Sequence, residues 1–137
     1  MPLWKCYYHV IWATKYRQPI ITPQHERIIY PAIRQKCYDL KGQVLEINGV
    51  ADHIHVVLTI HPSKSLADVV KEMKGVSSYA VNQTLSSREP FRWQGSYSAL
   101  TFGEKVIPDL IDYVTHQKQR HQQGSTWAYL EELDNSE

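Results

Sequence analysis

Cysteine and long hydrophobic runs are both scarce in this sequence, and each shortage excludes a class of protein. Only Cys6 and Cys37 occur among 137 residues, too few and too isolated for a disulfide framework or a cysteine-based zinc site. We expect both to be small buried hydrophobic residues. No apolar stretch approaches the ~20 residues needed to cross a bilayer, which excludes a membrane span. The N-terminal residues lack the features of a secretory signal, which predicts a cytoplasmic protein.

An excess of one charge is also lacking, because 15 Lys and Arg residues balance 14 Asp and Glu residues, leaving a net charge of +1. Overall charge therefore neither indicates nor excludes a nucleic-acid-binding protein. Residues 131–137 include four acids and no base, so the remainder of the chain is basic. A chain of this length has material for one hydrophobic core, and we expect a single domain over residues 1–137.

The sequence is rich in branched and aromatic residues, and their distribution predicts four strands. Two of these segments are separated by only three residues, which is short enough for an antiparallel hairpin. The predicted strands span residues 3–14, 44–50, 54–60 and 97–102.

Helical spacing of apolar residues predicts three main helices between and after these strands. Thr22 and Ser65 are expected N-caps, and Pro31 is expected to kink or delay the first helix. The predicted helices follow these caps to about residues 42 and 86, and the third runs from residue 104 to about 121. The order βαββαβ plus a final helix predicts an α+β fold, a ferredoxin-like antiparallel sheet with helices on one face.

Two histidines, His53 and His55, stand one residue apart at the start of an apolar strand. Side chains alternate along a strand, so both imidazoles point to one face while Ile54 points to the other. Neutral imidazoles bind divalent metals well, and this pair would supply two adjacent ligands. Taken alone, the motif is more typical of exposed or hydrogen-bonded strand histidines than of a metal site.

Tyr113 and Gln117 are four residues apart on the last long helix, so they share one stripe of its surface. The neighbouring stripe, which includes Leu110 and Val114, faces the core. The phenol and the amide are therefore expected at the seam between core and solvent, where a phenol can reach a ligand. The alternative is a boundary tyrosine that buries its ring and keeps its hydroxyl in water.

Four ordered motifs together resemble the HUH single-tyrosine transposases of small bacterial insertion sequences, the insertion-sequence-200 type. Residues 8–17 are similar to the family's first strand with its Thr-Lys-Tyr-Arg ending, and residues 52–55 to its His-hydrophobic-His motif. Residues 74–78 resemble its Lys-Gly-x-Ser-Ser segment. Residues 113–117 resemble its catalytic tyrosine with a glutamine four positions on. Matches in the right order are far more specific than any single motif.

The resemblance implies a DNA transposase that cleaves and rejoins single-stranded DNA through a 5′-phosphotyrosine intermediate. Tyr113 would be the nucleophile, and His53, His55 and Gln117 would bind Mg²⁺ or Mn²⁺ against the scissile phosphate. It further implies hairpin-forming element ends as substrate. The family's dimers imply a homodimer in which the tyrosine helix of one subunit can complete the site of the other, with Gly103 as the pivot.

Single-stranded DNA recognition combines cations on phosphates with aromatic faces on which bases stack. Each candidate is equally compatible with an ordinary solvated surface. The candidates are Lys15, Tyr16, Arg17, Lys71, Lys74, Arg92 and Trp93.

Two other functions remain open. One is a domesticated, nonmobile relative that binds single-stranded DNA or hairpins without cleaving them, which the presence of Tyr113 and both histidines disfavours. The other is a zinc hydrolase that adds His61 to the histidine pair, although His61 would lie about 20 Å from His55 along an extended strand.

Overall fold

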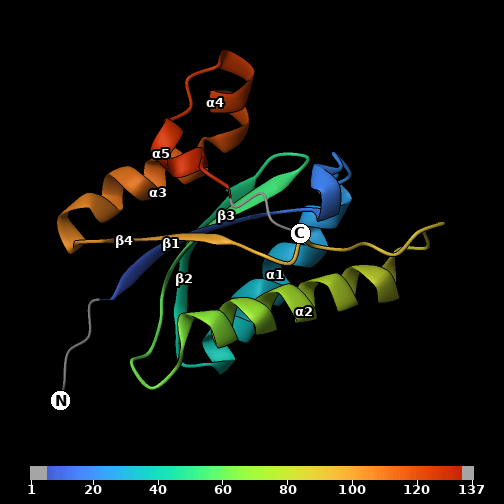
Figure 1. Cartoon of the computed structure of the whole chain (residues 1–137), viewed down its shortest axis with the longest axis horizontal. Helices are drawn as coiled ribbons and strands as arrows, with labels where there is room; N and C mark the ends of the chain where they lie inside the picture. The colour runs from blue at the N-terminus through green and yellow to red at the C-terminus, as the bar shows by residue number, and fades with distance from the viewer. Residues whose placement is uncertain (1–5, 134–137) are drawn as a thin grey trace.

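The fold is a four-stranded antiparallel sheet, seen in a computed structural model that describes residues 6–133. The spatial order is β2-β3-β1-β4, so the two central strands are β3 and β1 (Figure 1). The predicted strands are therefore present with shifted ends, and residues 3–5 of the first lie outside the described residues. The bounds are β1 Tyr7–Ala13, β2 Gln43–Gly49, β3 His53–Thr59 and β4 Ser98–Phe102.

Strand pairing confirms the predicted hairpin and fixes the register of the central strands. β2 and β3 pair antiparallel across a short turn, with a register shift between Val44 and Glu46. On its other side β3 pairs with β1, which places Ala13 opposite His53 and Ile11 opposite His55. The histidine segment therefore lies in the middle of the sheet, where neighbouring strands hold its backbone on both sides.

Two long helices, α1 (Pro23–Asp39) and α2 (Leu66–Thr84), cover one face of the sheet and enclose the larger core (Figure 1). Alternate residues of the central strands, including Trp12 and Ile54, point into this layer and are fully buried. Both predicted N-caps are confirmed, because Thr22 accepts from the backbone of His25 and Ser65 accepts from that of Asp68. The helix α1 continues through Pro31 and begins at Pro23, so the expected late start is wrong.

The C-terminal helices lie on the opposite face of the sheet: α3 (Ile107–Thr115), α4 (Gln117–Gln123) and α5 (Ala128–Glu131) (Figure 1). Short 3-10 turns, η1 (Lys15–Arg17) and η2 (Glu104–Val106), follow β1 and β4. A second, smaller cluster joins α3 and α5 to the sheet through Val57, Leu110 and Leu130.

The predicted third helix is broken at His116, whose φ of −100° and ψ of 24° leave the helical region. The break is anchored on β2, because Asn48 donates to the carbonyl oxygen of Thr115 at 2.9 Å and the Thr115 hydroxyl contacts Glu46 at 2.8 Å. Lys118 then binds Glu26 and Asn48, at 2.7 and 2.6 Å. Long-range polar contacts therefore end α3 and fix where α4 starts.

The expectation that both cysteines are buried is half wrong, since Cys37 is buried and Cys6 is exposed. Gly75, in α2, also differs from a closely packed helix glycine. A Cβ added there would meet nothing within 4 Å, so packing against the sheet does not require a glycine at this position.

Gly49 is a different case, and a paired substitution tests the contrast. A Cβ at Gly49 would lie 2.3 Å from the His53 carbonyl oxygen and 2.8 Å from Ile54 Cα, and backbone atoms cannot move aside cheaply. We expect Gly49→Ala to destabilise the protein by about 1–3 kcal/mol and Gly75→Ala to stabilise it by up to about 1 kcal/mol. Urea unfolding midpoints measure both, and equal shifts of the two variants would contradict this account.

Candidate active site

The two strand histidines lie on the sheet face that α3 covers. His53 and His55 are buried, and their ring centroids are 5.1 Å apart. Ile54 between them points into the α1 and α2 layer, as alternation along a strand requires. The predicted common orientation of the two imidazoles is therefore confirmed.

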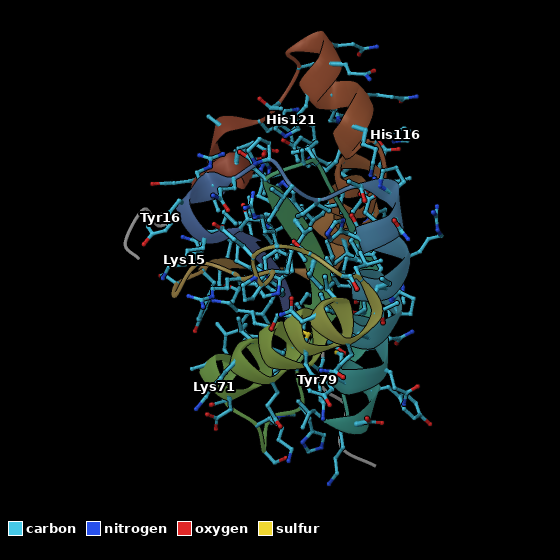
Figure 2. All side chains as sticks on the ribbon, turned by 90° about the vertical axis from the view of Figure 1, so that its right-hand side faces the viewer. Lys15, Tyr16, Lys71, Tyr79, His116 and His121 are labelled. Carbon is cyan, nitrogen blue, oxygen red and sulfur yellow. The ribbon has the colours of Figure 1, made fainter. Side chains whose placement is uncertain are left out.

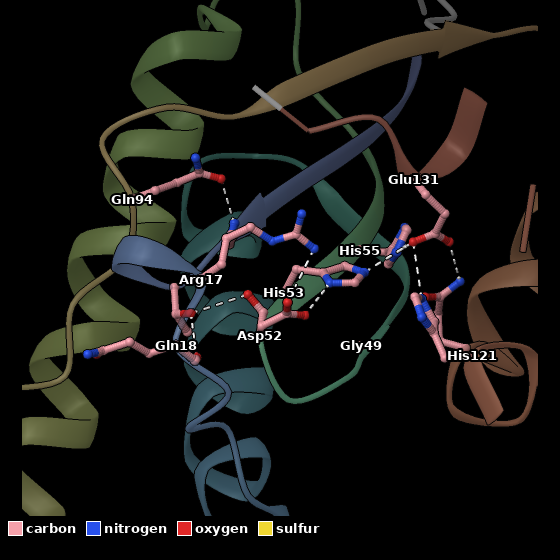
Figure 3. A network of polar contacts seen from close by, with 12 residues as sticks. Arg17, Gln18, Gly49, Asp52, His53, His55, Gln94, His121 and Glu131 are labelled. Atoms are coloured by element: carbon pink, nitrogen blue, oxygen red, sulfur yellow. Dashed lines mark hydrogen bonds and ion pairs between the residues drawn. The ribbon is translucent and has the colours of Figure 1, made fainter. Parts of the chain in front are cut away.

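A carboxylate from α5, that of Glu131, lies at the centre of the site (Figure 3). Its Oε1 atom is 3.1 Å from His53 Nε2 and 3.2 Å from His55 Nε2. The same oxygen is 3.2 Å from Nε2 of His121, which comes from α4. We call these four residues, His53, His55, His121 and Glu131, the histidine–carboxylate cluster.

Tyr113 meets this cluster through the other oxygen of the same carboxylate. Its hydroxyl donates to Glu131 Oε2 and accepts from the backbone N–H of Trp127 at 3.0 Å. The Trp127 ring stacks on the phenol at 4.7 Å, and the Arg120 guanidinium lies 4.8 Å from the phenol ring centroid. Tyr113 is 0% exposed, so the expected seam with solvent is wrong: α5 covers the phenol.

Gln117 is also fully buried and contacts the cluster at its edge. Its Nε2 donates to Glu131 Oε2 at 3.2 Å, and its Oε1 lies 3.1 Å from His121 Nε2. Although the helix breaks between Tyr113 and Gln117, both side chains reach one carboxylate oxygen. The predicted proximity of phenol, amide and histidine pair is thus present within one chain.

The imidazole nitrogens that face away from Glu131 have partners of their own. His53 Nδ1 is 2.7 Å from Asp52 Oδ1, and His55 Nδ1 is 2.8 Å from Nε2 of the buried His9. A proton on His53 Nδ1, donated to Asp52, leaves Nε2 free to bind a metal. His55 Nε2 is likewise free to bind a metal when the Nδ1 proton of His55 is donated to His9 Nε2. These contacts orient both rings toward one point.

Burial and hydrogen bonding separate the protonation states of the site. Burial lowers the pKa of His55 to about 4, against the opposing effect of Glu131, and burial next to His55 lowers the pKa of His9 to about 3. Burial alone would lower the pKa of His53, but hydrogen bonds to Asp52 and Glu131 raise it.

The acidic groups are also shifted. Burial would raise the pKa of Glu131, but its hydrogen bonds with His53 and His55 outweigh burial and hold the pKa well below the usual range. Burial and the hydrogen bond to Glu131 raise the pKa of Tyr113 to about 12. At neutral pH the site therefore pairs an ionised carboxylate with a neutral phenol.

The cluster fits a divalent cation. One ligand atom from each of its four residues lies within 4.8 Å of all the others. Three imidazoles and a carboxylate form a mixed set that suits Mn²⁺ and other transition ions better than Mg²⁺, which prefers oxygen ligands. His61 is not part of this group, since its Nδ1 contacts Ser63 Oγ at 2.7 Å beyond the end of β3. This placement excludes the zinc site in which His61 joins the histidine pair.

Comparison with known proteins identifies the family. The model of the family described as "Transposase IS200 like" matches residues 2–117. The chain belongs to the IS200-like transposase family.

Sequence relatives of this transposase extend over most of its length. It is 29% identical to the transposase of insertion sequence IS200 from Salmonella typhimurium over 126 residues, which cover 88% of this chain and 82% of the relative. It is 25% identical to the ISDra2 transposase TnpA of Deinococcus radiodurans over 115 residues, covering 80% and 82% of the two chains.

Solved structures show the same fold. A Deinococcus radiodurans R1 protein assigned as a transposase superposes with a TM-score of 0.67 at 25% identity, covering 85% of this chain and 93% of that one. A REP-associated tyrosine transposase bound to a REP hairpin gives a TM-score of 0.65 at 13% identity, covering 92% and 76%. In the described part of this transposase, no helix is both long enough and apolar enough to span a bilayer.

Some predicted DNA-binding residues of the transposase are on its surface. Lys15 and Arg92 line a shallow hollow together with Tyr16, which is 70% exposed at the end of β1. Tyr16 and Arg17 adopt left-handed backbone conformations with φ of 58° and 53°, which are uncommon for such residues. Lys15 and Tyr16 project from one side of the molecule, with Lys71 farther along on α2 (Figure 2).

The other candidates have structural contacts. Arg17 pairs with Asp52 at 3.2 Å, and Lys74 donates to the carbonyl oxygens of Gln94 and Ser96. Trp93 is only 8% exposed and donates from Nε1 to Ser77 Oγ at 3.0 Å. Its ring is part of the core, so Trp93 presents no exposed face for a base to stack on in this structure.

Three residues of the site were not predicted from the sequence: His9, His121 and Glu131. His9 on β1 and His55 on the adjacent strand β3 lie on the same face of the sheet. Alternation of side chains along the predicted first strand could have indicated this position for His9. His121 and Glu131 gave no such signal. Their positions depend on the break at His116 and on the turn that brings α5 back over α3.

The pKa shifts predict that the metal-free transposase loses stability as pH falls from about 6.5 to about 5. His9 and His55 have folded pKa values below the ~6.5 of an unfolded histidine, so in this range only the unfolded chain takes up their protons. His53 has a raised pKa, so its folded form binds the proton at least as readily as the unfolded chain and does not add to this loss. The expected loss is on the order of 2 kcal/mol per histidine at most.

Urea unfolding in EDTA at both pH values measures this loss. His9→Gln should make the pH dependence shallower because it removes one of the two groups. An equal dependence in the variant and the unmodified protein would show that the buried pair does not control acid stability.

Proposed function

We propose that this transposase cleaves and rejoins single-stranded DNA at insertion-sequence ends, with Tyr113 as the nucleophile. One observation carries the proposal: the Tyr113 hydroxyl and the Nε2 atoms of His53 and His55 all contact the carboxylate of Glu131. A phenol and two metal-binding imidazoles are thus separated by a single acidic group. This is the spacing at which a phosphate group can contact both.

His53, His55 and Gln117 would hold Mg²⁺ or Mn²⁺, with His9 and Asp52 orienting the two imidazoles. When bound, the ion supplies positive charge that polarises the phosphoryl oxygens and stabilises the charge that develops during displacement. The donor chemistry supports this assignment, because three neutral nitrogen or amide oxygen donors leave open positions for phosphate and water.

The reaction at Tyr113 is a transesterification. The phenolic oxygen forms a bond to phosphorus while the bond from phosphorus to the 3′-oxygen breaks. The product is a 5′-phosphotyrosine ester with a free 3′-hydroxyl, so the phenol loses one proton and the leaving oxygen gains one. Attack by another 3′-hydroxyl reverses the step and rejoins DNA without ATP.

Substrate access requires α5 to move. In the structure Trp127 stacks on the phenol and Glu131 fills the space between phenol and imidazoles. While Trp127 and Glu131 stay in place, the phosphorus atom of a DNA phosphate cannot come close enough to the Tyr113 hydroxyl oxygen to form a bond. Displacement of this short, four-residue helix would uncover the nucleophile without disturbing the sheet.

We expect the partner to be single-stranded DNA, including hairpin element ends. The solved relative bound to a REP hairpin supports this class of partner, and Lys15, Tyr16 and Arg92 offer cations and an exposed ring for it. A homodimer is also proposed from the family. The tyrosine helix does not have to be exchanged between subunits, because Tyr113 and the two histidines already lie together within one chain.

Because α5 covers the phenol, a second function is also supported: the protein would be a nonmobile relative of the transposases that binds DNA hairpins without cleaving them. In that case α5 would remain closed over Tyr113 in the DNA complex. The two functions differ in whether a covalent product forms.

The test is incubation of the full chain with labelled single-stranded element ends and Mg²⁺ or Mn²⁺, followed by denaturing electrophoresis. We expect an adduct that survives denaturation, its loss in Tyr113→Phe by a factor of at least about 10³, since the nucleophile is gone, and no adduct with duplex DNA. Tyr38→Phe, at an exposed tyrosine on α1, is the matched control and should retain the adduct. DNA binding without adduct in any metal would instead establish the binding relative.

A further inference from the structure

The family match ends at residue 117, yet two members of the histidine–carboxylate cluster come after it. His121 lies on α4 and Glu131 on α5. The matched segment contains the histidine pair, Tyr113 and Gln117, and therefore does not account for the other half of the cluster. The role of these two residues has to be argued from the contacts in this chain.

Both residues aim a ligand atom at the point toward which the strand histidines converge. His121 Nε2 is 3.2 Å from Glu131 Oε1, and the rings of His53 and His121 have centroids 5.1 Å apart. All three imidazoles face the oxygen through Nε2, at 3.1 to 3.2 Å. Ligands on one ion with bonds near ~2.1 Å lie roughly 3.0–3.4 Å apart, so these nitrogen-to-oxygen separations suit joint coordination.

The surroundings also favour a role as ligands over a surface ion pair. Tyr113 and Gln117 hold the second oxygen of Glu131, which leaves Oε1 directed at the imidazoles. Leu130 is buried next to Glu131 and fixes α5 on the body of the protein. Gln117 Oε1 contacts His121 and limits the rotation of its ring. Ligand atoms held by such outer contacts are typical of metal sites.

We propose that His121 and Glu131 join His53 and His55 as metal ligands in the DNA-free protein, so that this transposase closes its own cation site with residues from its C-terminal segment. In this closed form Gln117 contacts Glu131 and His121, and it becomes a ligand only when Glu131 leaves. The inference rests on the proposed function, because it takes His53 and His55 to be metal ligands. It adds that the DNA-free protein holds a transition-metal ion through three imidazoles and one carboxylate.

The chemical consequence is a site with two forms. Four protein ligands complete a tetrahedral ion and leave no open position, as in structural metal sites. A scissile phosphate enters only when Glu131 leaves, and the same movement uncovers Tyr113. Metal coordination and access to the nucleophile would thus be linked through one residue, and borderline ions such as Mn²⁺ or Co²⁺ would bind this nitrogen-rich site more tightly than Mg²⁺.

Metal titration of the full, EDTA-stripped chain tests the proposal without reference to activity. Calorimetry with MnCl₂ gives the affinity, and the visible spectrum with CoCl₂ reports whether the ion is four-coordinate, which absorbs strongly, or six-coordinate, which absorbs weakly. We expect His121→Ala and Glu131→Gln each to weaken Mn²⁺ binding by about tenfold or more, and each to weaken the four-coordinate Co²⁺ absorption.

Two neighbours provide matched controls. His116→Ala and Glu132→Gln change the same residue types at exposed positions near the cluster, and both should bind Mn²⁺ as the unmodified protein does. Melting in EDTA shows whether each variant folds. Because Glu131→Gln keeps the size of the side chain, it remains informative if His121→Ala is unstable.

The outcomes separate this inference from the proposed function. Weaker Mn²⁺ binding in His53→Ala and His55→Ala, but unchanged or tighter binding in both the His121 and Glu131 variants, would overturn the inference alone and identify Glu131 as a competitor of the metal. If the His53 and His55 variants also bind Mn²⁺ normally, the metal centre of the proposed function fails as well. Weaker binding in all four variants, with both controls normal, supports the four-ligand site.

Discussion

The carboxylate of Glu131 is the contact on which the arrangement of the site depends. One of its oxygens faces three imidazoles, and the other faces the Tyr113 phenol and the Gln117 amide. Removing an ionised group from water is costly unless it is fully hydrogen-bonded, and these partners supply the bonds. The short helix α5 is therefore held over the site by polar contacts as well as by Leu130 and the stacked Trp127.

The sheet makes this cluster possible by dividing its two faces between separate tasks. Ile54 and its alternate neighbours enter the large core under α1 and α2, while His53 and His55 face α3. Because β3 lies between β2 and β1, its backbone is bonded on both sides, and His9 on β1 can support His55 from the next strand. The imidazoles are thus positioned by strands at the centre of the sheet, whereas the groups that must move come from the C-terminal end of the chain.

Local sequence signals were sufficient for most of the fold. Thr22 and Ser65 are capping residues whose effect depends on the next three residues, and the alternation around Ile54 needs only a strand. The helix break at His116 could not be predicted in this way, because Asn48 and Lys118 meet across a large separation in sequence. The burial of Trp93 was missed for the same reason, since Ser77 and Trp12 are its partners.

By itself the sequence determined the order of the elements, the shared face of His53 and His55, and the resemblance carried by Tyr113 and Gln117, since these depend on short-range spacing. Only the tertiary structure decided that Tyr113 is covered and that His121 and Glu131 join the histidine pair. Their meeting requires a helix break and a reversal of the chain, both stabilised by contacts between distant segments. Spacing along a chain does not encode such contacts, because they form only when the layers pack.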